Sequence, residues 1–295
     1  MEKIIQVKSG LSKNKKPSNW FGIHYNVNPY RGCGHQCIYC DARSECYQVE
    51  DFNQLEIKEN IAENIRKELR TKRQKGTIGT GGMCDPYTPL EKKYRLTRKI
   101  LEAIEFYSYP VFLFTKSANI LEDLELLKKI NSKAKCSVAI TITTIDDEIA
   151  RIIEPGASSS TKRLETLQTL CESGIYAGVT MMPILPFIND KEEDIIKLVQ
   201  ACAYYGAKFI IAYFGVTLRD RQRDYYYEKL DQHYPGLKEK YHNLYGNRYA
   251  CNVTNAKRLY QVFEKECRKY GIVYKMQDVM TYEKENTLSQ LHFEL

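Results

Sequence analysis

The 295-residue sequence contains no run of the roughly 18 consecutive apolar residues that a membrane-spanning helix needs. Its Lys-rich start, Met1 to Lys16, also lacks the apolar core of a signal peptide. It contains neither an internal repeat nor a low-complexity tract. We therefore expect a soluble cytoplasmic protein with no membrane partner.

A large charge excess is also missing. Lys and Arg total 44 against 37 Asp and Glu, and the net charge of +7 is too small for a chain that coats nucleic acid non-specifically. The densest basic run, between Arg66 and Lys75, lies on a helical pattern whose solvated face explains it. No helix-turn-helix motif, zinc finger or basic arm is evident. DNA is a possible but disfavoured partner, and a small substrate is the simpler case.

Hydrophobic residues make up 43% of the chain, enough to bury a large core, and they are arranged in alternating short and long patterns. The β-rich runs are Gly22–Val27, Thr77–Gly81, Val111–Thr115, Ser137–Thr144, Tyr176–Met182 and Phe209–Phe214. The helical patterns between them are Glu56–Arg73, Glu91–Phe106, Ala118–Ile130, Arg163–Cys171 and Lys191–Tyr205. This alternation predicts an α/β fold, a partial TIM-type (β/α)6 barrel with a parallel sheet.

The alternation of strand and helix patterns ends after Phe214. A charged, Tyr-rich stretch follows, then a helical pattern near Lys257–Tyr270 and a short strand pattern at Ile272–Lys275. We expect three parts: an N-terminal extension over 1–21, the barrel core over 22–216, and a C-terminal α-rich cap over 217–295. The cap is expected to complete the substrate site.

The most specific motif is the spacing C-x3-C-x2-C formed by Cys33, Cys37 and Cys40, directly after the first predicted strand. Three thiolates on one short loop can hold three irons of a [4Fe-4S] cluster and leave the fourth iron open. The alternative is a zinc site, which normally needs a fourth Cys or His. His35 lies in the loop, too close to its neighbours to complete a tetrahedron comfortably, and the spacing favours the cluster.

This trio, with the aromatic Tyr39 just before the third cysteine, resembles the radical S-adenosylmethionine (SAM) superfamily. Five motifs resemble its spore photoproduct lyase-like group: Asn28-Pro-Tyr-Arg-Gly-Cys33, Cys84-Asp-Pro-Tyr-Thr-Pro-Leu-Glu91, Thr115-Lys-Ser117, Thr143-Thr-Ile-Asp146, and Glu154-Pro-Gly-Ala157 followed by Arg163. The resemblance implies a [4Fe-4S] cluster, S-adenosylmethionine as cofactor, and a reductant of the flavodoxin or ferredoxin type. It also implies a 5′-deoxyadenosyl radical that takes a hydrogen atom from the substrate.

The resemblance also implies a cofactor site at the carboxyl ends of the strands. The segment with Gly81 and Gly82 would receive the amino group of S-adenosylmethionine. Lys116 would pair with its carboxylate. The remaining residues expected to bind the cofactor are Tyr39, Thr141, Thr143, Arg163 and Pro183. A plain Gly-rich turn, a solvated lysine and ordinary strand threonines remain open as alternatives.

Substrate contacts are expected from aromatic and charged residues around the same opening. The candidates for substrate binding are His24, Tyr30, Tyr87, Tyr213, Arg219, Arg221 and Arg223, and those for catalysis are Cys84, Asp85 and Asp220. A guanidinium can bind a phosphate, and a carboxylate can hold a cationic amine. The alternatives are a core histidine and a helix whose charges face water.

The cysteine that returns a hydrogen atom in spore photoproduct lyase aligns with Gly82, while Cys84 occupies a serine position. This departure argues against thymine-dimer repair. The chain looks more like a group member that releases queuine from a queuosine nucleotide by cleaving the glycosidic C–N bond. The alternatives are a DNA repair enzyme of the spore photoproduct lyase type and a non-catalytic metal-binding protein.

Overall fold

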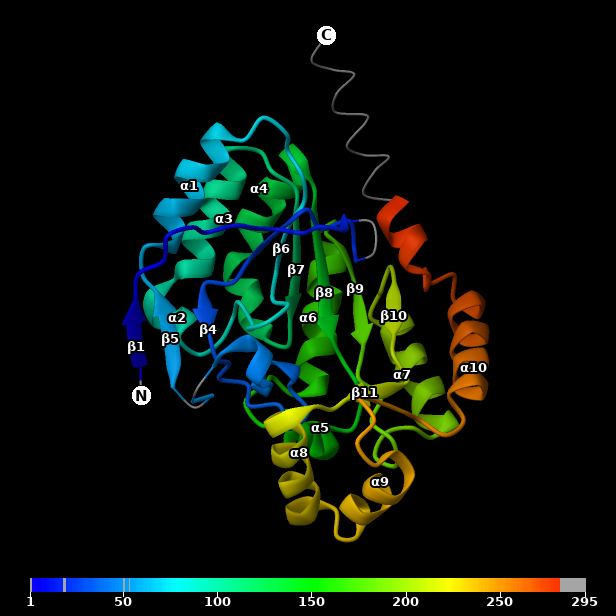
Figure 1. The fold of residues 1–295 in the computed structure, drawn as a ribbon. Helices are drawn as coiled ribbons and strands as arrows, with labels where there is room; N and C mark the ends of the chain where they lie inside the picture. Colours follow the sequence, from blue (N-terminus) through cyan, green and yellow to red (C-terminus); the bar gives the residue numbers. More distant parts are fainter. Residues whose placement is uncertain (1, 18–19, 50, 53, 282–295) are drawn as a thin grey trace.

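The computed structural model describes residues 2–17, 20–49, 51–52 and 54–281. Its central sheet has seven strands in the order β10-β9-β8-β7-β6-β3-β2 (Figure 1). Neighbouring strands are parallel except at the edge, where β2 is antiparallel to β3. The bounds are β2 (Ser12–Lys13), β3 (Tyr25–Val27), β6 (Ile78–Thr80), β7 (Val111–Thr115), β8 (Cys136–Thr141), β9 (Tyr176–Met181) and β10 (Ile210–Ala212). The six predicted strands and the α/β partial barrel are confirmed.

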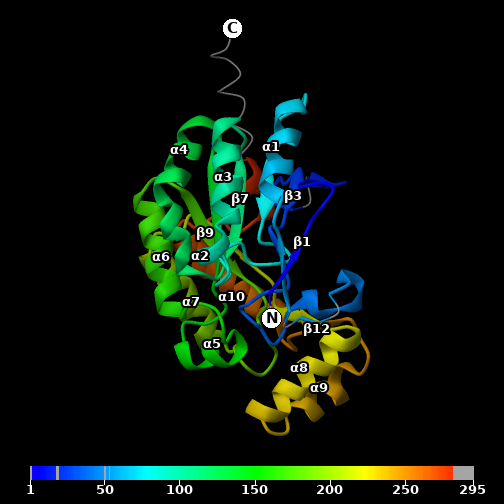
Figure 2. The ribbon, with the colours of Figure 1, turned by 90° about the vertical axis from the view of Figure 1, so that its left-hand side faces the viewer.

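Helices pack against one face of this sheet (Figure 2). They are α1 (Ile61–Thr71), α3 (Leu96–Phe106), α4 (Leu124–Ala134), α6 (Ser160–Glu172) and α7 (Glu192–Tyr204). Two short helices, α2 (Glu91–Tyr94) and α5 (Asp147–Ile153), follow β6 and β8. Helix α5 was not predicted; the Asp146 side chain caps it by accepting hydrogen bonds from the Glu148 and Ile149 amides. No helix among the described residues is long and apolar enough to cross a membrane.

The predicted helix over Glu56–Arg73 starts later than expected. Leu55–Lys58 forms strand β5, which pairs with β1 (Glu2–Ile5) and β4 (Tyr30–Arg31) in a small second sheet. The apolar–polar alternation of these four residues suits a strand as well as a helix, and backbone partners on both sides decide for the strand. Residues of the expected N-terminal extension thus supply edge strands to both sheets.

Strand alternation divides the core into two layers. On β7, Val111 and Leu113 face the helices, whereas Phe112 and Phe114 belong to an aromatic cluster on the opposite face of the sheet. Phe21 joins this inner cluster from the N-terminal segment, and Val279 joins it from the C-terminal one. The inner face of the barrel is therefore filled by side chains from both ends of the chain.

The C-terminal part contains α8 (Asp220–His233), α9 (Leu237–Tyr245), the strand pair β11 (Gly215–Thr217) and β12 (Ala250–Asn252), and α10 (Ala256–Lys269). Helices α8 and α9 lie together at the bottom of Figure 1, whereas α10 packs along α7 at the side of the barrel. The strand expected at Ile272–Lys275 is reduced to a single bridge, between Val273 and Phe209 at the edge of β10.

Candidate functional site

The three cysteines of the motif lie on the loop between β4 and the short 3-10 helix η2 (Asp41–Arg43), beyond the carboxyl end of β3. Cys33 and Cys37 are buried, Cys40 is half-buried, and none forms a disulfide. Turn hydrogen bonds from the Gln36 amide to the Cys33 carbonyl and from the Cys40 amide to the Cys37 carbonyl, both 3.3 Å, shape the loop. The loop therefore offers three reduced thiols in a shielded place.

The loop between α5 and α6 clamps this cysteine loop. The Ile38 amide donates to the Ile153 carbonyl and the Gly156 amide to the His35 carbonyl, both at 2.9 Å. A Cβ atom on Gly156 would lie 2.2 Å from the Gly34 carbonyl oxygen, so only glycine fits this approach. The clamp fixes the backbone between the cysteines from a distant part of the chain.

A buried ion pair extends the clamp. The Glu154 carboxylate accepts a hydrogen bond from the Tyr39 hydroxyl and pairs with the Arg163 guanidinium at 2.6 Å. Arg163 also donates to the Thr141 carbonyl at 2.7 Å. Burial opposes the charge on Glu154, but Arg163 and Lys116 together hold the pKa of its carboxyl below the usual value. The structure thus links three predicted cofactor residues: Tyr39 and Arg163 both bond to Glu154, and Arg163 also bonds to the Thr141 carbonyl.

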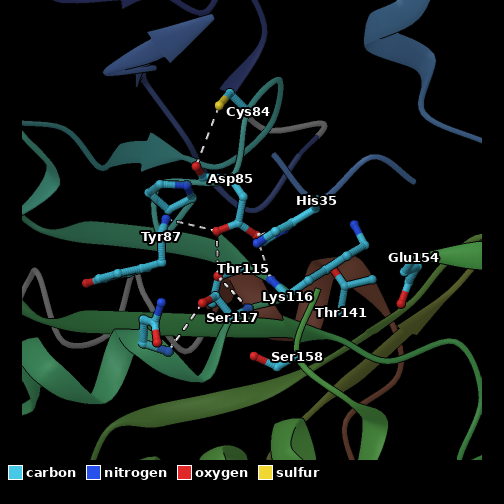
Figure 3. A network of polar contacts seen from close by, with 12 residues as sticks. His35, Cys84, Asp85, Tyr87, Thr115, Lys116, Ser117, Thr141, Glu154 and Ser158 are labelled. Atoms are coloured by element: carbon cyan, nitrogen blue, oxygen red, sulfur yellow. Dashed lines mark hydrogen bonds and ion pairs between the residues drawn. The ribbon is translucent and has the colours of Figure 1, made fainter. Parts of the chain in front are cut away.

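A second buried network is centred on Asp85 (Figure 3). One carboxylate oxygen accepts from the Tyr87 amide at 2.9 Å and the Thr115 hydroxyl at 2.7 Å. The other accepts from the Lys116 amide at 2.7 Å and lies 3.2 Å from the His35 imidazole. Burial would raise the pKa of Asp85, but His35 and the donated hydrogen bonds outweigh it and lower the pKa to about 2. Because both oxygens are engaged, Asp85 holds the site together rather than presenting a free carboxylate to a substrate amine.

The side chain of Lys116 points back toward the cysteines. Its ammonium lies 5.8 Å from the centre of the Tyr39 ring. Burial opposes its charge, yet Cys37, Glu154 and other anionic partners raise its pKa. A fixed cation close to Cys37 and Cys40 favours their thiolate forms and any anionic group that the loop binds.

Cys84 lies against the first cysteine of the motif. Its thiol is 2% exposed, donates to the Gly32 carbonyl at 2.8 Å and contacts the thiol of Cys33. The hydrogen bond with Cys33, together with burial, raises its pKa well above the usual value, so Cys84 stays a neutral thiol. It is placed beside a cysteine ligand and away from solvent.

The other predicted cofactor residues lie where strands end. Gly81 has a φ of +95°, and a Cβ atom there would lie 2.1 Å from the Phe114 carbonyl oxygen, whereas Gly82 has open space around it. Thr143 is 1% exposed, and its hydroxyl has no hydrogen-bond partner among the described residues. Pro183 follows β9 through a cis peptide bond. Thr143 thus keeps a buried, unused polar group close to this end of the sheet.

Three predicted substrate residues are placed elsewhere. His24 precedes β3, at the amino end of the sheet, and is exposed beside Gly76. Because the motif cysteines follow the carboxyl end of the same strand, His24 lies at the opposite end. Tyr30 and Tyr87 are buried and donate their hydroxyls to Glu91 and Asp123. Tyr30 and Tyr87 are thus core residues with satisfied hydroxyls, and the assignment of these three residues to substrate binding stays a prediction.

The charged residues at the start of α8 reach the segment after the cysteine loop. Arg219 makes an ion pair with Asp41 at 2.7 Å, and Asp220 accepts from the Ser44 hydroxyl at 2.8 Å. Arg221 donates to the Arg43 carbonyl at 2.7 Å and to the Val49 carbonyl. These groups join α8 to the rest of the protein, and their assignment to substrate binding and catalysis stays a prediction.

Arg223 and Tyr213 have similar roles. Arg223 donates to three backbone carbonyls between 2.8 and 3.0 Å, those of Leu218, Asn247 and Arg248. The Tyr213 hydroxyl donates to the Asn252 side chain at 3.1 Å. Both hold the cap segments together, and their assignment to substrate binding stays a prediction.

The sequence reasoning did not single out Arg43 and Gln222, and it quoted Glu154 only as part of a motif. Gln222 is fully buried and donates to the Tyr39 carbonyl at 3.0 Å, which ties α8 directly to the cysteine loop. No short-range pattern marks Gln222, because its partner lies 183 positions away. Arg43 follows Cys40 by three residues, and this closeness in the sequence could have marked it as a neighbour of the cysteine loop.

Comparisons with known proteins agree with this site. The Radical SAM superfamily model matches residues 27–199. An uncharacterized protein of Mycobacterium tuberculosis is 31% identical over 231 residues, covering 76% of this chain and 67% of that protein. An uncharacterized protein of Methanocaldococcus jannaschii is 32% identical over 210 residues, which cover 70% of this chain and 78% of that protein. A radical SAM Nalpha-GlyT isomerase of Pseudomonas phage M6 is 24% identical over 189 residues, which cover 64% of this chain and 38% of that protein.

Among solved structures, spore photoproduct lyase complexed with dinucleoside spore photoproduct has a TM-score of 0.65 to this chain at 16% identity. The match covers 90% of this chain and 79% of that one, and at this identity it shows a shared fold.

A parallel partial barrel with a three-cysteine loop at the carboxyl ends of its strands defines a class of iron–sulfur enzyme. The chain belongs to the radical SAM superfamily. Membership implies a [4Fe-4S] cluster and S-adenosylmethionine as cofactors. The buried thiols and the adjacent Lys116 cation suit an anionic cluster, so the residues present fit this group.

Proposed function

We propose that this radical SAM enzyme abstracts a hydrogen atom from a substrate that carries a nucleobase and so triggers cleavage of a bond in it. The observation that carries the proposal is the loop with Cys33, Cys37 and Cys40, buried beside the Lys116 cation. When bound, the cluster and S-adenosylmethionine supply a 5′-deoxyadenosyl radical. The queuosine 5′-phosphate that the sequence suggested is the first substrate to test.

In this proposal the three cysteines bind three irons through their sulfurs. Lys116 places its ammonium near that group, where it would pair with the carboxylate of S-adenosylmethionine. Thr143 would donate its unused hydroxyl to the same cofactor, since a buried hydroxyl without a partner costs free energy. The backbone at Gly81 and Gly82 leaves room for a close approach.

Support for a flat, apolar part of the substrate comes from exposed side chains at this end of the barrel. Met83, Ile145 and Phe187 follow β6, β8 and β9, and each is more than a third exposed. Apolar and aromatic side chains around the carboxyl ends of parallel strands are suited to contact a base. Arg219 and Arg221 are bound to other parts of the chain, so the proposal assigns them no phosphate.

A second candidate is repair of damaged DNA. The fold likeness to spore photoproduct lyase favours it. Against it, the position expected to hold the hydrogen-donating cysteine is Gly82. Cys84 is 2% exposed and bonded to the Gly32 carbonyl, so it is poorly placed to reach a substrate radical.

The test uses protein reconstituted anaerobically with iron and sulfide, then reduced with dithionite. Incubation with S-adenosylmethionine and queuosine 5′-phosphate should give 5′-deoxyadenosine and free queuine. Cys37→Ala should abolish both products, whereas Cys171→Ala, a half-buried thiol outside the site, should not. Absence of queuine refutes the lyase activity, and repair of dinucleoside spore photoproduct in a parallel reaction would establish the second candidate.

A further inference from the structure

Arg43 is an almost fully buried cation whose guanidinium is held between two aromatic rings. Its central carbon lies 4.1 Å from the centre of the Phe52 ring and 3.6 Å from that of Tyr225 on α8. The side chain of Gln36, from the cysteine loop, accepts a hydrogen bond from one terminal nitrogen. Rings this close to the guanidinium shield its faces, so a further partner would be reached through its N–H edges.

One of these edges has no partner. The Nε atom of Arg43 is buried and makes no hydrogen bond to the described residues, and none of their carboxylates forms an ion pair with the guanidinium. Leaving a buried donor on a charged group unsatisfied costs free energy, so a further acceptor at this place would stabilise the protein. Cys33, Cys37 and Cys40 all lie within electrostatic reach of this cation and favour its charged form, although burial is the larger effect and lowers its pKa.

The Arg43 side chain bonds to Gln36 within the cysteine loop, and its amide donates to the Cys40 carbonyl at 3.2 Å. We propose that the cation fixed in this way beside the loop raises the reduction potential of the cluster that the loop holds. Reduction adds one negative charge, and a nearby fixed cation with an N–H donor stabilises the reduced form more than the oxidised form. Hydrogen bonds to the sulfurs and the net charge around a cluster set its potential.

Arg43 is thus a positioning and tuning residue that touches no substrate. The aromatic pair explains why the cation stays in place without a carboxylate. Phe52 and Tyr225 hold it flat, whereas a carboxylate would neutralise the charge that the cluster would otherwise feel. Tyr225 comes from the cap, so docking of α8 and the electrostatics of the cysteine loop are coupled. The inference rests on the cysteine loop holding the cluster, and it does not depend on which substrate is cleaved.

The test compares Arg43→Met and Arg43→Lys with the wild type after anaerobic reconstitution. Iron content, thermal midpoint and the midpoint potential of the cluster are measured, the potential by a redox titration followed by electron paramagnetic resonance. Arg43→Met should lower the ratio of reduced to oxidised cluster at a fixed potential about tenfold, equal to about 59 mV for one electron. Arg43→Lys should recover part of this shift. The control Arg258→Met removes an exposed arginine on α10 and should leave the potential unchanged.

A purely structural role would lower the thermal midpoint of both Arg43 variants equally and leave the potential of the retained cluster at the wild-type value, which overturns the proposal. If Arg43→Met does not hold iron, the proposal is tested with Tyr225→Leu, which removes one of the two aromatic rings against Arg43 and keeps the Arg43 charge. It should shift the potential in the same direction by less, and an unchanged potential overturns the proposal. These outcomes are separate from the activity assay, since wild-type enzyme that fails to cleave queuosine 5′-phosphate still has a measurable potential.

Discussion

Replacing Glu154 with glutamine should destabilise the protein strongly, because its carboxylate is the partner of a fully buried arginine. The Glu154 and Arg163 side chains are 0% and 1% exposed and 2.6 Å apart. Removing one member of a buried pair costs about 3–5 kcal/mol, since the other charge is left uncompensated. Glutamine can still accept one hydrogen bond from Arg163, so we expect about 3 kcal/mol. At about 2 °C per kcal/mol for a chain of this size, the thermal midpoint should fall by about 6 °C.

The assay is thermal unfolding of cluster-free protein, with Glu63→Gln as the matched control. Glu63 pairs with Lys67 at 2.6 Å on the exposed face of α1, where screening by water makes the pair worth little, so its loss should not move the midpoint. The pKa of Glu154 is held below its usual value, so its contribution to stability is present above pH 4.5 and is lost as the pH falls through the folded-state pKa. The difference between wild type and Glu154→Gln should therefore narrow in acid. A midpoint equal to that of Glu63→Gln at pH 7 would refute the reasoning.

Two further predictions concern the other buried contacts of the site. Because the pKa of Asp85 is lowered from 3.8 to about 2, its carboxylate stabilises the fold by about 2 kcal/mol above pH 4, and this stabilisation is lost as the pH falls toward 2. Asp85→Asn should therefore unfold at a lower temperature than wild type at pH 5, with the gap closing near pH 2; a gap that is constant with pH would contradict this. Arg221→Met removes charged hydrogen bonds to the Arg43 and Val49 carbonyls and should lower stability by about 2 kcal/mol and speed cluster loss in air, as measured by the decay of visible absorption. If Arg221→Met were as stable as wild type but lost affinity for the nucleotide substrate, this stability prediction would be refuted and the assignment of Arg221 to substrate binding supported.

The central sheet was predictable because its strands carry a strong local signal. Val111–Thr115 consists of four apolar residues followed by a threonine, and all five are buried. The apolar four pack alternately against the helices and the inner aromatic cluster. The cysteine loop was equally visible, since the spacing that holds a cluster is short and local. Leu55–Lys58 shows the limit of local reasoning: its alternation fits two structures, and only the distant β1 strand selects one.

The arginines of α8 show why site residues are harder to predict. A guanidinium near the carboxyl end of a barrel can bind a phosphate or a backbone carbonyl, and the residue type is the same in both cases. Arg221 meets the Arg43 carbonyl 178 positions away, a partner that no local pattern in the sequence reveals. His24 lies at the amino end of the expected strand. The strand itself was predicted correctly, but the prediction for His24 overlooked that parallel strands present their site residues at the carboxyl end.

The contacts around the cysteine loop explain why so many buried charges occur in one place. Glu154, Asp85, Lys116 and Arg43 come from four separate segments, and each bonds to the loop or faces its thiols. A buried charge is costly unless its partners stay in position, so each pair tolerates few alternative arrangements of the loop. An apolar core of equal size would stabilise the loop without fixing its orientation as narrowly. The buried charges therefore hold the loop in the one orientation in which its three cysteine sulfurs can bind the same cluster.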